Sequence, residues 1–405
     1  MSGLFGIGDR ARQQILERAL SRRSTAAAQA KPAPGGIQTR RRLGDPKRYE
    51  EIRLIREASQ RLQLGNPFFM VHDARAADTT SIGNRELLNF TTYNYCGLNG
   101  DPRVSAAAAA AIERYGTSVG ASRLVAGERP IHGDLERKLA EHYGTEDCIA
   151  MVSGHATNVT AIGCLLSSED LILHDSLAHN SIVQGAILSG ARRMAFPHND
   201  MQALDRMLER ARAGARQVLI AIEGHYSMDG DVPDLAGAIA IARRHDALLL
   251  VDEAHSLGVL GETGKGIAEH LSVDPSGVDV WMGTLSKTLS SCGGYLAGSA
   301  ELIDYLRYTA PGFVYSVGLS PPLAAAASTS LDLLHAEPWR VAKLRENASL
   351  FLAEARAAGL DTGPSIGASI VPVIVGSSIR AARAANLLLE RGVNVQPIIH
   401  PAVQE

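Results

Sequence analysis

The chain has 405 residues, of which 45% are hydrophobic and 20% are charged, and its formal net charge is −3 at pH 7. This balance is typical of a globular protein with a large buried core, and the length allows about two or three domains. The weakly negative charge argues against nucleic-acid binding. No apolar run reaches the roughly 18 residues of a membrane span, so no membrane-spanning segment is expected. Four cysteines without CxxC spacing favour free thiols in the cytoplasm over disulfides or a zinc site.

Residues 1–47 differ in composition from the rest of the chain. They are rich in Ala, Pro, Gly and Arg and show no sustained hydrophobic period. We therefore predict a flexible tail or linker. Its arginine-rich end, "TRRRLGDPKR" (39–48), would suit an acidic partner. A more regular N-terminal segment follows over residues 48–100, with a helical period at first and then a strand that leads into "FTTYNYCGL".

Short apolar runs alternate with helical segments over residues 101–330. The runs are "CIAMV", "DLILHD", "QVLIAIEG", "ALLLVDEAH" and "VDVWMGTLSK". Several are apolar throughout, as expected for strands that are covered on both faces. This pattern predicts an α/β domain with a mainly parallel central sheet and helices on both faces. Ligands of such sheets bind beyond the carboxyl ends of the strands, where the polar residues of these runs fall.

The pattern changes again over residues 331–405. Two possible strands, over 364–376 and 392–401, flank a helical segment over 379–392. We therefore expect a smaller C-terminal α+β domain.

The string "VDEAHS" (251–256) has two possible interpretations. An acid after a buried strand can hold magnesium in a P-loop enzyme, or it can face the cofactor of a pyridoxal 5'-phosphate (PLP) enzyme. The P-loop interpretation fails, because the one similar string, "GETGKGI" (261–267), follows the acidic strand and has Gly266 where Ser or Thr must bind the metal.

The PLP interpretation requires an acid, a Schiff-base lysine and a phosphate site. Asp252 can keep a pyridine nitrogen protonated, and Lys287 follows another apolar strand in "GTLSKTLSSCGGY" (283–295). Thr284 and Ser286 flank this lysine and can donate to a phosphate. In "VSGHATN" (152–158), Ser-Gly precedes a helix whose free amide groups suit a dianion. Further downstream, "HDSLAHNSI" and "EGHYSMDGD" present His179 and Ser227 after other strands.

Together these motifs resemble the α-oxoamine synthases, fold-type I PLP-dependent transferases that include serine palmitoyltransferase and 8-amino-7-oxononanoate synthase. The resemblance begins near residue 49 and rests on "GTSVGASRLVAGERPIHGDLE", "SGHATN", "AHNSI", "EGHYSMDGDVPDL", "VDEAHSLGVLG", "GTLSKTL" and "FVYSVGLSPP". It implies condensation of an amino acid with an acyl thioester, in most relatives with loss of carbon dioxide, to give an α-aminoketone. "NPFF" and "YNY" are similar to serine palmitoyltransferase and to modules that work with acyl carrier proteins.

The resemblance also implies a role for each matching residue. The implied catalytic residues are Lys287, which binds the cofactor covalently and moves a proton, His179 on the ring face, Asp252 at the pyridine nitrogen, and His255. The implied cofactor-binding residues are Ser153, Gly154, His155, His179, Ser227, Asp252, His255, Thr284, Ser286, Lys287 and Ser316. Tyr93 and Asn94 would contact the amino acid. Ser316 would reach the phosphate in the neighbouring subunit of a homodimer.

Two alternatives remain open at this point. An aminotransferase of class I/II would share Asp252 and Lys287, and a regulatory PLP-binding protein would bind the cofactor without catalysis. The amino acid, the acyl length and the choice between coenzyme A and a carrier protein are not determined by the motifs. No metal site is expected, because the spacing of His174, His179 and His198 matches no metal motif. The resemblance places a carboxylate-binding arginine beyond residue 405, which would leave the C-terminal domain incomplete.

Overall fold

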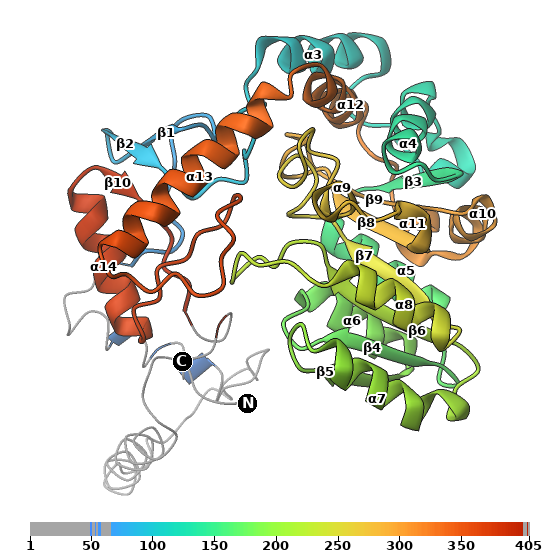
Figure 1. The fold of residues 1–405 in the computed structure, drawn as a ribbon. Helices are drawn as coiled ribbons and strands as arrows, with labels where there is room; N and C mark the ends of the chain where they lie inside the picture. Colours follow the sequence, from blue (N-terminus) through green and yellow to red (C-terminus); the bar gives the residue numbers. More distant parts are fainter. Residues whose placement is uncertain (1–48, 51–52, 54–55, 58–65, 400–402, 404–405) are drawn as a thin grey trace, which may run out of the picture. The chain divides into compact units, whose positions relative to one another are not determined.

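A computed structural model describes residues 49–50, 53, 56–57, 66–399 and 403, so the predicted tail over residues 1–47 lies outside the described residues. The chain forms two compact units (Figure 1). The larger unit comprises residues 75–77 and 92–374, and the smaller one comprises the described residues before 75, residues 78–91 and those after 374. The predicted border at residue 330 falls inside a helix, and residues 331–374 belong to the larger unit.

The larger unit contains a seven-stranded sheet with the strand order β3-β9-β8-β7-β6-β4-β5. Its strands are β3 (Asp147–Met151), β4 (Leu171–Asp175), β5 (Arg192–Phe196), β6 (Val218–Glu223), β7 (Leu248–Asp252), β8 (Val280–Thr284) and β9 (Gly294–Gly298). The strands from β8 to β5 pair in parallel, and β9 runs antiparallel to both of its neighbours. The predicted mainly parallel sheet is therefore confirmed.

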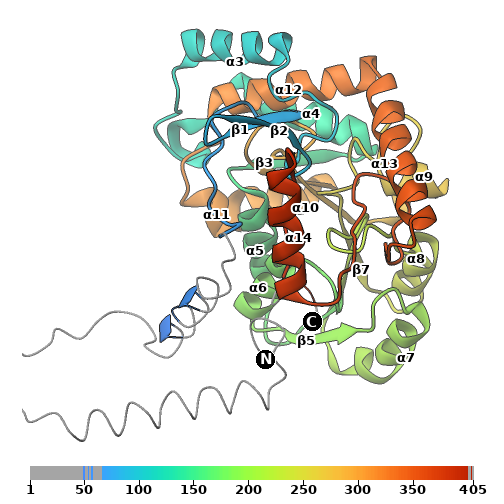
Figure 2. The ribbon, with the colours of Figure 1, turned by 90° about the vertical axis from the view of Figure 1, so that its left-hand side faces the viewer.

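The continuous apolar runs become strands that are buried on both faces. In β7, Leu249 and Val251 belong to one hydrophobic core and Leu250 to another, because successive side chains of a strand point to opposite faces. One core includes side chains of α4, α7, α8 and α12, and the other includes side chains of α5, α6 and α10. Figure 2 shows α5 and α6 on one side of the strands and α7 and α8 on the other. The predicted helices on both faces are thus confirmed.

Four helices of the larger unit, α3, α5, α7 and α8, begin at a residue whose side chain caps the helix. Asp101, Ser153, Asp200 and Asp234 each accept a backbone amide at a helix start, which satisfies donors that would otherwise lack a partner. The helices are α3 (Pro102–Tyr115), α4 (Pro130–Tyr143), α5 (Gly154–Leu165), α6 (Asn180–Ser189), α7 (Met201–Ala211), α8 (Leu235–Arg244), α9 (Ile267–Leu271), α10 (Ala300–Thr309), α11 (Pro311–Val314), α12 (Pro321–Ala336) and α13 (Trp339–Ala357). None of the helices in the described ranges is both long and apolar enough to cross a membrane.

In the part that the structure describes from residue 66 onward, the smaller unit contains a three-stranded sheet, β1-β2-β10, and the helix α14. Its elements are β1 (Thr79–Ile82), β2 (Arg85–Asn89), α14 (Ser378–Glu390) and β10 (Val393–Asn394). The predicted helix over 379–392 is confirmed, but the predicted strand over 364–376 is wrong, since these residues form no strand. A strand needs a sheet edge as a hydrogen-bond partner, and apolar sequence alone does not supply one.

Candidate active site

Several polar side chains gather at one edge of the seven-stranded sheet, where its parallel strands end. Asp175, Glu223, Asp252 and Thr284 are the last residues of β4, β6, β7 and β8. Glu223 and Asp252 are direct partners in the pairing of β6 with β7. Both carboxyl groups are buried. Buried charged groups require partners, so their contacts indicate what this edge can bind.

Asp252 is held by two hydrogen-bond donors. The side-chain amide of Asn158 donates to Oδ2 at 2.8 Å, and the backbone amide of Ala254 donates to Oδ1 at 2.9 Å. Asn158 lies on α5, one turn after Gly154, so the same helix face reaches both the carboxylate and the start of the helix. These donors fix the orientation of the Asp252 carboxylate.

Lys287 lies three residues beyond the end of β8 and contacts His255. Its Nζ is 2.8 Å from His255 Nε2, and the hydroxyl of Tyr95 is 2.8 Å from Nδ1 of the same ring. Burial lowers the pKa of Lys287 to about 8, against the attraction of Asp252 and Glu223. Burial and the neighbouring Lys287 hold the pKa of His255 well below its usual value. The pair therefore combines a neutral imidazole with an amine that loses its proton easily.

The end of β6 supports the loop that carries His179. Glu223 accepts a hydrogen bond from the His179 backbone amide at 2.5 Å. Burial raises the pKa of Glu223 well above its usual value, and the charge of Asp252 adds to this shift. His179 precedes α6, and its Nδ1 accepts from the backbone amide of Ser181. The His179 ring lies edge-on to the ring of His155, with centroids 6.1 Å apart.

The predicted phosphate site lies at the start of α5. Ser153 caps this helix through a hydrogen bond from the Ala156 amide. Within the described chain, the amides of Gly154 and His155 donate no hydrogen bond. A side chain at position 154 would meet Thr284 Oγ1 at 2.8 Å, so glycine is required for this close approach. The structure thus brings Ser153, Gly154, His155 and Thr284 together.

Ser286 lies beside Thr284 in the turn before Lys287. Both hydroxyls donate to the carbonyl of Gly293, at 3.5 Å for Ser286 and 3.0 Å for Thr284. The Ser286 backbone amide donates to Thr284 Oγ1. The two hydroxyls are therefore close to each other and to the start of β9.

Ser227 and Ser316 are placed less directly than the other predicted residues. Ser227 is half-buried in the loop between β6 and α8, and Ser316 is half-buried between α11 and α12. Neither side chain makes a hydrogen bond within the described residues. The structure thus places Ser227 after a neighbouring strand end, but it joins neither serine to Lys287 by a contact.

The two predicted substrate residues have different surroundings. The Tyr93 ring lies 5.5 Å from Lys287 Nζ and edge-on to His255, and 58% of Tyr93 is exposed. Asn94 instead donates to the carbonyl of Ala76 and accepts from the amide of Asn99. Tyr93 is therefore available at the site, whereas both ends of the Asn94 amide are occupied in a turn.

Tyr95, Asn158 and Glu223 are not among the site residues predicted from the sequence. Like Asp252, Glu223 is the buried last residue of an apolar strand, so the same signal could have identified it. Asn158 follows Gly154 by one helical turn, which is a weaker signal. Tyr95 has no local signal, because its partner His255 is 160 residues away.

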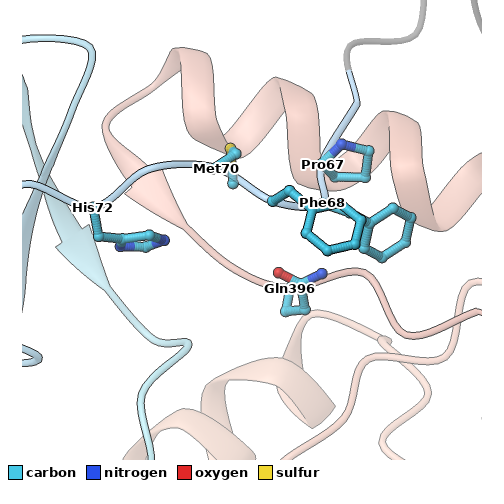
Figure 3. Close-up of a pocket in the computed structure, with 6 residues that line it drawn as sticks. Pro67, Phe68, Met70, His72 and Gln396 are labelled. Atoms are coloured by element: carbon cyan, nitrogen blue, oxygen red, sulfur yellow. The ribbon is translucent and has the colours of Figure 1, made fainter.

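Two cavities contain none of these residues in their linings. The first, of about 300 Å³ in the smaller unit, is shown in Figure 3 and is lined in part by the last three residues of the "NPFF" string. Its lining is Pro67, Phe68, Phe69, Met70, His72 and Gln396. The second, of about 510 Å³ in the larger unit, is lined by Arg123, Glu128, Arg129, Pro130, Gly133, Glu136 and Arg307. Neither includes a predicted site residue, so the strand ends remain the candidate active site.

The chain is similar in sequence and structure to several known proteins. A family model described as "Aminotransferase class I and II" matches residues 85–405. The 8-amino-7-oxononanoate synthase of Geobacter sulfurreducens is 43% identical over 321 residues, which cover 79% of this chain and 81% of that protein. Sphingomonas wittichii serine palmitoyltransferase has a similar structure, with a TM-score of 0.85, 32% identity, and coverage of 89% of this chain and 90% of that chain. A serine palmitoyltransferase structure with PLP as internal aldimine has a TM-score of 0.85, 28% identity, and coverage of 89% and 91%.

Proposed function

Because the chain belongs to the α-oxoamine synthases of the class I and II aminotransferase family, we propose that it condenses an amino acid with an acyl thioester. It is a PLP-dependent acyltransferase. The product would be an α-aminoketone, formed with loss of carbon dioxide from the amino acid. The observation that carries this proposal is the contact of Lys287 with His255 at the sheet edge that also presents Asp252.

The residues at this edge fit PLP by their chemistry. Gly154 and His155 offer two unused amides at the start of a twelve-residue helix, which suits a phosphate dianion. Asp252 offers an oriented carboxylate for a protonated pyridine nitrogen, and Lys287 offers an amine for the aldehyde. When bound, the cofactor supplies an electron sink for the carbanion of the amino acid.

The chain's own residues then hold and move protons. With its pKa lowered to about 8, the Lys287 amine can give up its proton near neutral pH and act as nucleophile or base. The low pKa of His255 keeps its ring neutral, so the ring orients the amine without adding a repelling charge. Tyr95 holds the other ring nitrogen in place. We assign His179 to the face of the PLP ring. We assign His255 and Ser227 to contacts with the phenolic oxygen of PLP.

We also propose that the active unit is a homodimer. Ser316 lies among large apolar side chains that face solvent in the single chain, with 86% of Tyr315, 48% of Val317 and 81% of Val125 exposed. The two segments that carry them are joined by a hydrogen bond from the Gly318 amide to the Ala121 carbonyl, 3.0 Å long. Apolar patches of this kind are characteristic of protein interfaces. A second copy covering this patch would bring Ser316 toward the phosphate of its neighbour.

The dimer can be tested by the mass of the protein in solution. Size-exclusion chromatography with light scattering should give twice the chain mass, and Tyr315→Glu should shift the protein toward the monomer. Tyr308→Glu, at another exposed tyrosine, is the matched control. A monomeric wild-type protein that turns over substrate would refute the dimer.

The acyl donor and the compartment complete the proposal. The arginines of residues 39–48 support an acidic acyl carrier protein as donor, since opposite charges accelerate encounter. If so, kcat/KM with the carrier-bound acyl group should fall as salt rises, whereas equal, salt-independent values for carrier and coenzyme A would exclude a preference. The four cysteines are all free, which supports the cytoplasm as the compartment.

Release of a free thiol tests the condensation itself. The PLP-loaded enzyme should release thiol from an acyl thioester only when a suitable amino acid is present, and a panel of amino acids would identify the substrate. Mass spectrometry should then find the α-aminoketone. Amino-group transfer to a keto acid without thioester, together with no thiol release, would instead show an aminotransferase.

A further inference from the structure

His198 lies between two carboxylates at the carboxyl edge of the sheet. It follows β5, and its Nδ1 is 2.9 Å from Asp175 Oδ1 while its Nε2 is 2.9 Å from Asp231 Oδ2. The side chain of Asp175 is fully buried and that of Asp231 is 11% exposed. Ionised carboxylates only accept hydrogen bonds, so both ring nitrogens must donate and the ring carries a positive charge.

The surroundings of His198 favour this charged form. Burial opposes the charge, but the hydrogen bonds and charges of Asp175 and Asp231 outweigh it and raise the pKa of His198 to about 10. Asn199 donates its backbone amide to Asp175 Oδ2 and its side-chain amide to Asp231 Oδ2. The Tyr226 ring lies edge-on to the His198 ring, with the two centroids 4.5 Å apart. Asp229, in the same loop as Asp231, also interacts with the His198 charge.

The two carboxylates belong to the loops that carry His179 and Ser227. Asp175 ends β4 and organises the first loop, because Oδ1 accepts the Leu177 amide at 2.8 Å and its carbonyl accepts the Ala178 amide at 3.0 Å. His179 follows directly.

Asp231 closes the second loop. Its carbonyl accepts the Tyr226 amide and His225 Nδ1, each at 3.0 Å, so the two residues that precede Ser227 are fixed to it. His198 thus joins two otherwise separate loops by one charged ring.

We infer that His198 is a positioning residue that holds the His179 and Ser227 loops at a fixed separation for the cofactor. This inference rests on the proposed assignment of these two residues to the cofactor. A buried ion network is a poor device for stability alone, because apolar side chains of similar volume stabilise a fold equally well. The directional hydrogen bonds of the His198 ring fix the distance between the two loops. Apolar packing, which has no preferred direction, would define that distance less sharply.

The test uses cofactor affinity and local exchange rather than activity. PLP is titrated into the cofactor-free wild type, His198→Gln, Ser227→Ala and the double variant, and the dissociation constant is read from absorbance and fluorescence. Amide hydrogen exchange is measured over residues 176–179 and 224–231. His245→Gln is the matched control, because His245 also bonds a carboxylate, Asp205, but does so between α7 and α8.

We expect His198→Gln and Ser227→Ala each to weaken PLP binding about tenfold. The double variant should weaken it by less than the roughly hundredfold expected from additive losses, because part of the His198→Gln effect is loss of the Ser227 contact. Exchange should rise in both loops of His198→Gln, while His245→Gln resembles the wild type. If His198→Gln does not fold, Asp231→Asn replaces it in the same set of single and double variants. This substitution weakens only one of the two His198 hydrogen bonds.

The other outcomes each overturn the inference. Additive losses, or a fall in melting temperature with unchanged PLP affinity, would make His198 structural only. An effect of Ser227→Ala without one of His198→Gln would leave the proposed site standing and remove His198 from it. If Ser227→Ala changes nothing, the assignment of Ser227 fails and the inference fails with it.

Discussion

Lys287 Nζ lies 2.8 Å from His255 Nε2, so the amine proposed to bind the cofactor contacts an imidazole whose pKa is well below its usual value. A neutral ring orients the amine without repelling its charged form. Labelling should show this amine to be the reactive one. Borohydride reduction of the PLP-loaded enzyme, followed by peptide mapping, should place the label on Lys287. It should not place it on Lys265, the lysine that lies between Asp252 and Lys287 in the sequence. Label on another lysine would refute the assignment.

Asp252→Asn should retain PLP but lose most activity. An amide cannot keep a pyridine nitrogen protonated, and its NH₂ group would face the amide donor of either Asn158 or Ala254. We expect kcat to fall by about 100-fold or more. Glu253→Gln is the matched control, because burial raises the pKa of the neighbouring Glu253 to about 8 and its carboxyl is already largely neutral at pH 7. Comparable losses in both variants would argue against a specific role for Asp252.

The rate of covalent PLP capture should depend on the protonation of Lys287. Only the neutral amine reacts, so the rate in cofactor-free enzyme should rise about tenfold per pH unit and level off near the lowered pKa of about 8. Stopped-flow absorbance measures it. A plateau only above about pH 10.4, the ordinary lysine pKa, would show that burial does not act as inferred.

The same shift predicts a pH dependence of stability. Between about pH 8 and 10.4 the unfolded chain binds the Lys287 proton and the folded chain does not, so unfolding free energy should rise with pH in this window. The raised pKa of His198 has the opposite effect on the unfolding free energy. The charged His198 ring stabilises the fold fully below the histidine pKa of the unfolded chain, and this stabilisation is lost as pH rises toward about 10. Urea unfolding of wild type and Lys287→Met, taken as a difference, isolates Lys287. A difference that does not change across the window would contradict this prediction.

Tyr95→Phe should weaken the site without disrupting the fold. It removes the hydroxyl that contacts His255 Nδ1 and nothing else that is polar. The loss of one hydrogen bond corresponds to about 0.5–1.5 kcal/mol, so PLP affinity should fall about two- to tenfold. Tyr93→Phe is the control, because its exposed ring contacts Lys287 through its face. If Tyr93→Phe lowers PLP affinity and Tyr95→Phe does not, the role given to Tyr95 is wrong.

Glu136→Gln should destabilise the larger unit. Glu136 is buried between Arg123, with Nη2 to Oε2 at 2.9 Å, and Arg307, at 3.3 Å. Removing its charge leaves a buried guanidinium without full compensation, which costs about 3 kcal/mol. Glu141→Gln, in an exposed pair with Arg137, should change unfolding free energy by less than about 0.5 kcal/mol. Equal small effects would show that the buried network is solvated.

The amino-acid sequence by itself determined the sheet and the main chemical residues. Uninterrupted apolar runs predict strands buried on both faces, and parallel strands end at one edge, so Asp252 and Lys287 could be expected together without coordinates. Gly154 was also predictable as the start of a helix, whereas its close approach to Thr284 was not. These features depend on local pattern, which the order of residues contains.

Only the tertiary structure decided which distant side chains complete the site. Tyr95 meets His255 across 160 residues, and His198 meets Asp175 and Asp231 across 23 and 33 residues. The strand expected over 364–376 did not form, although its sequence is apolar. Each of these outcomes depends on which surfaces and hydrogen-bonding groups the packed chain brings within about 3 Å, and sequence spacing does not encode that distance.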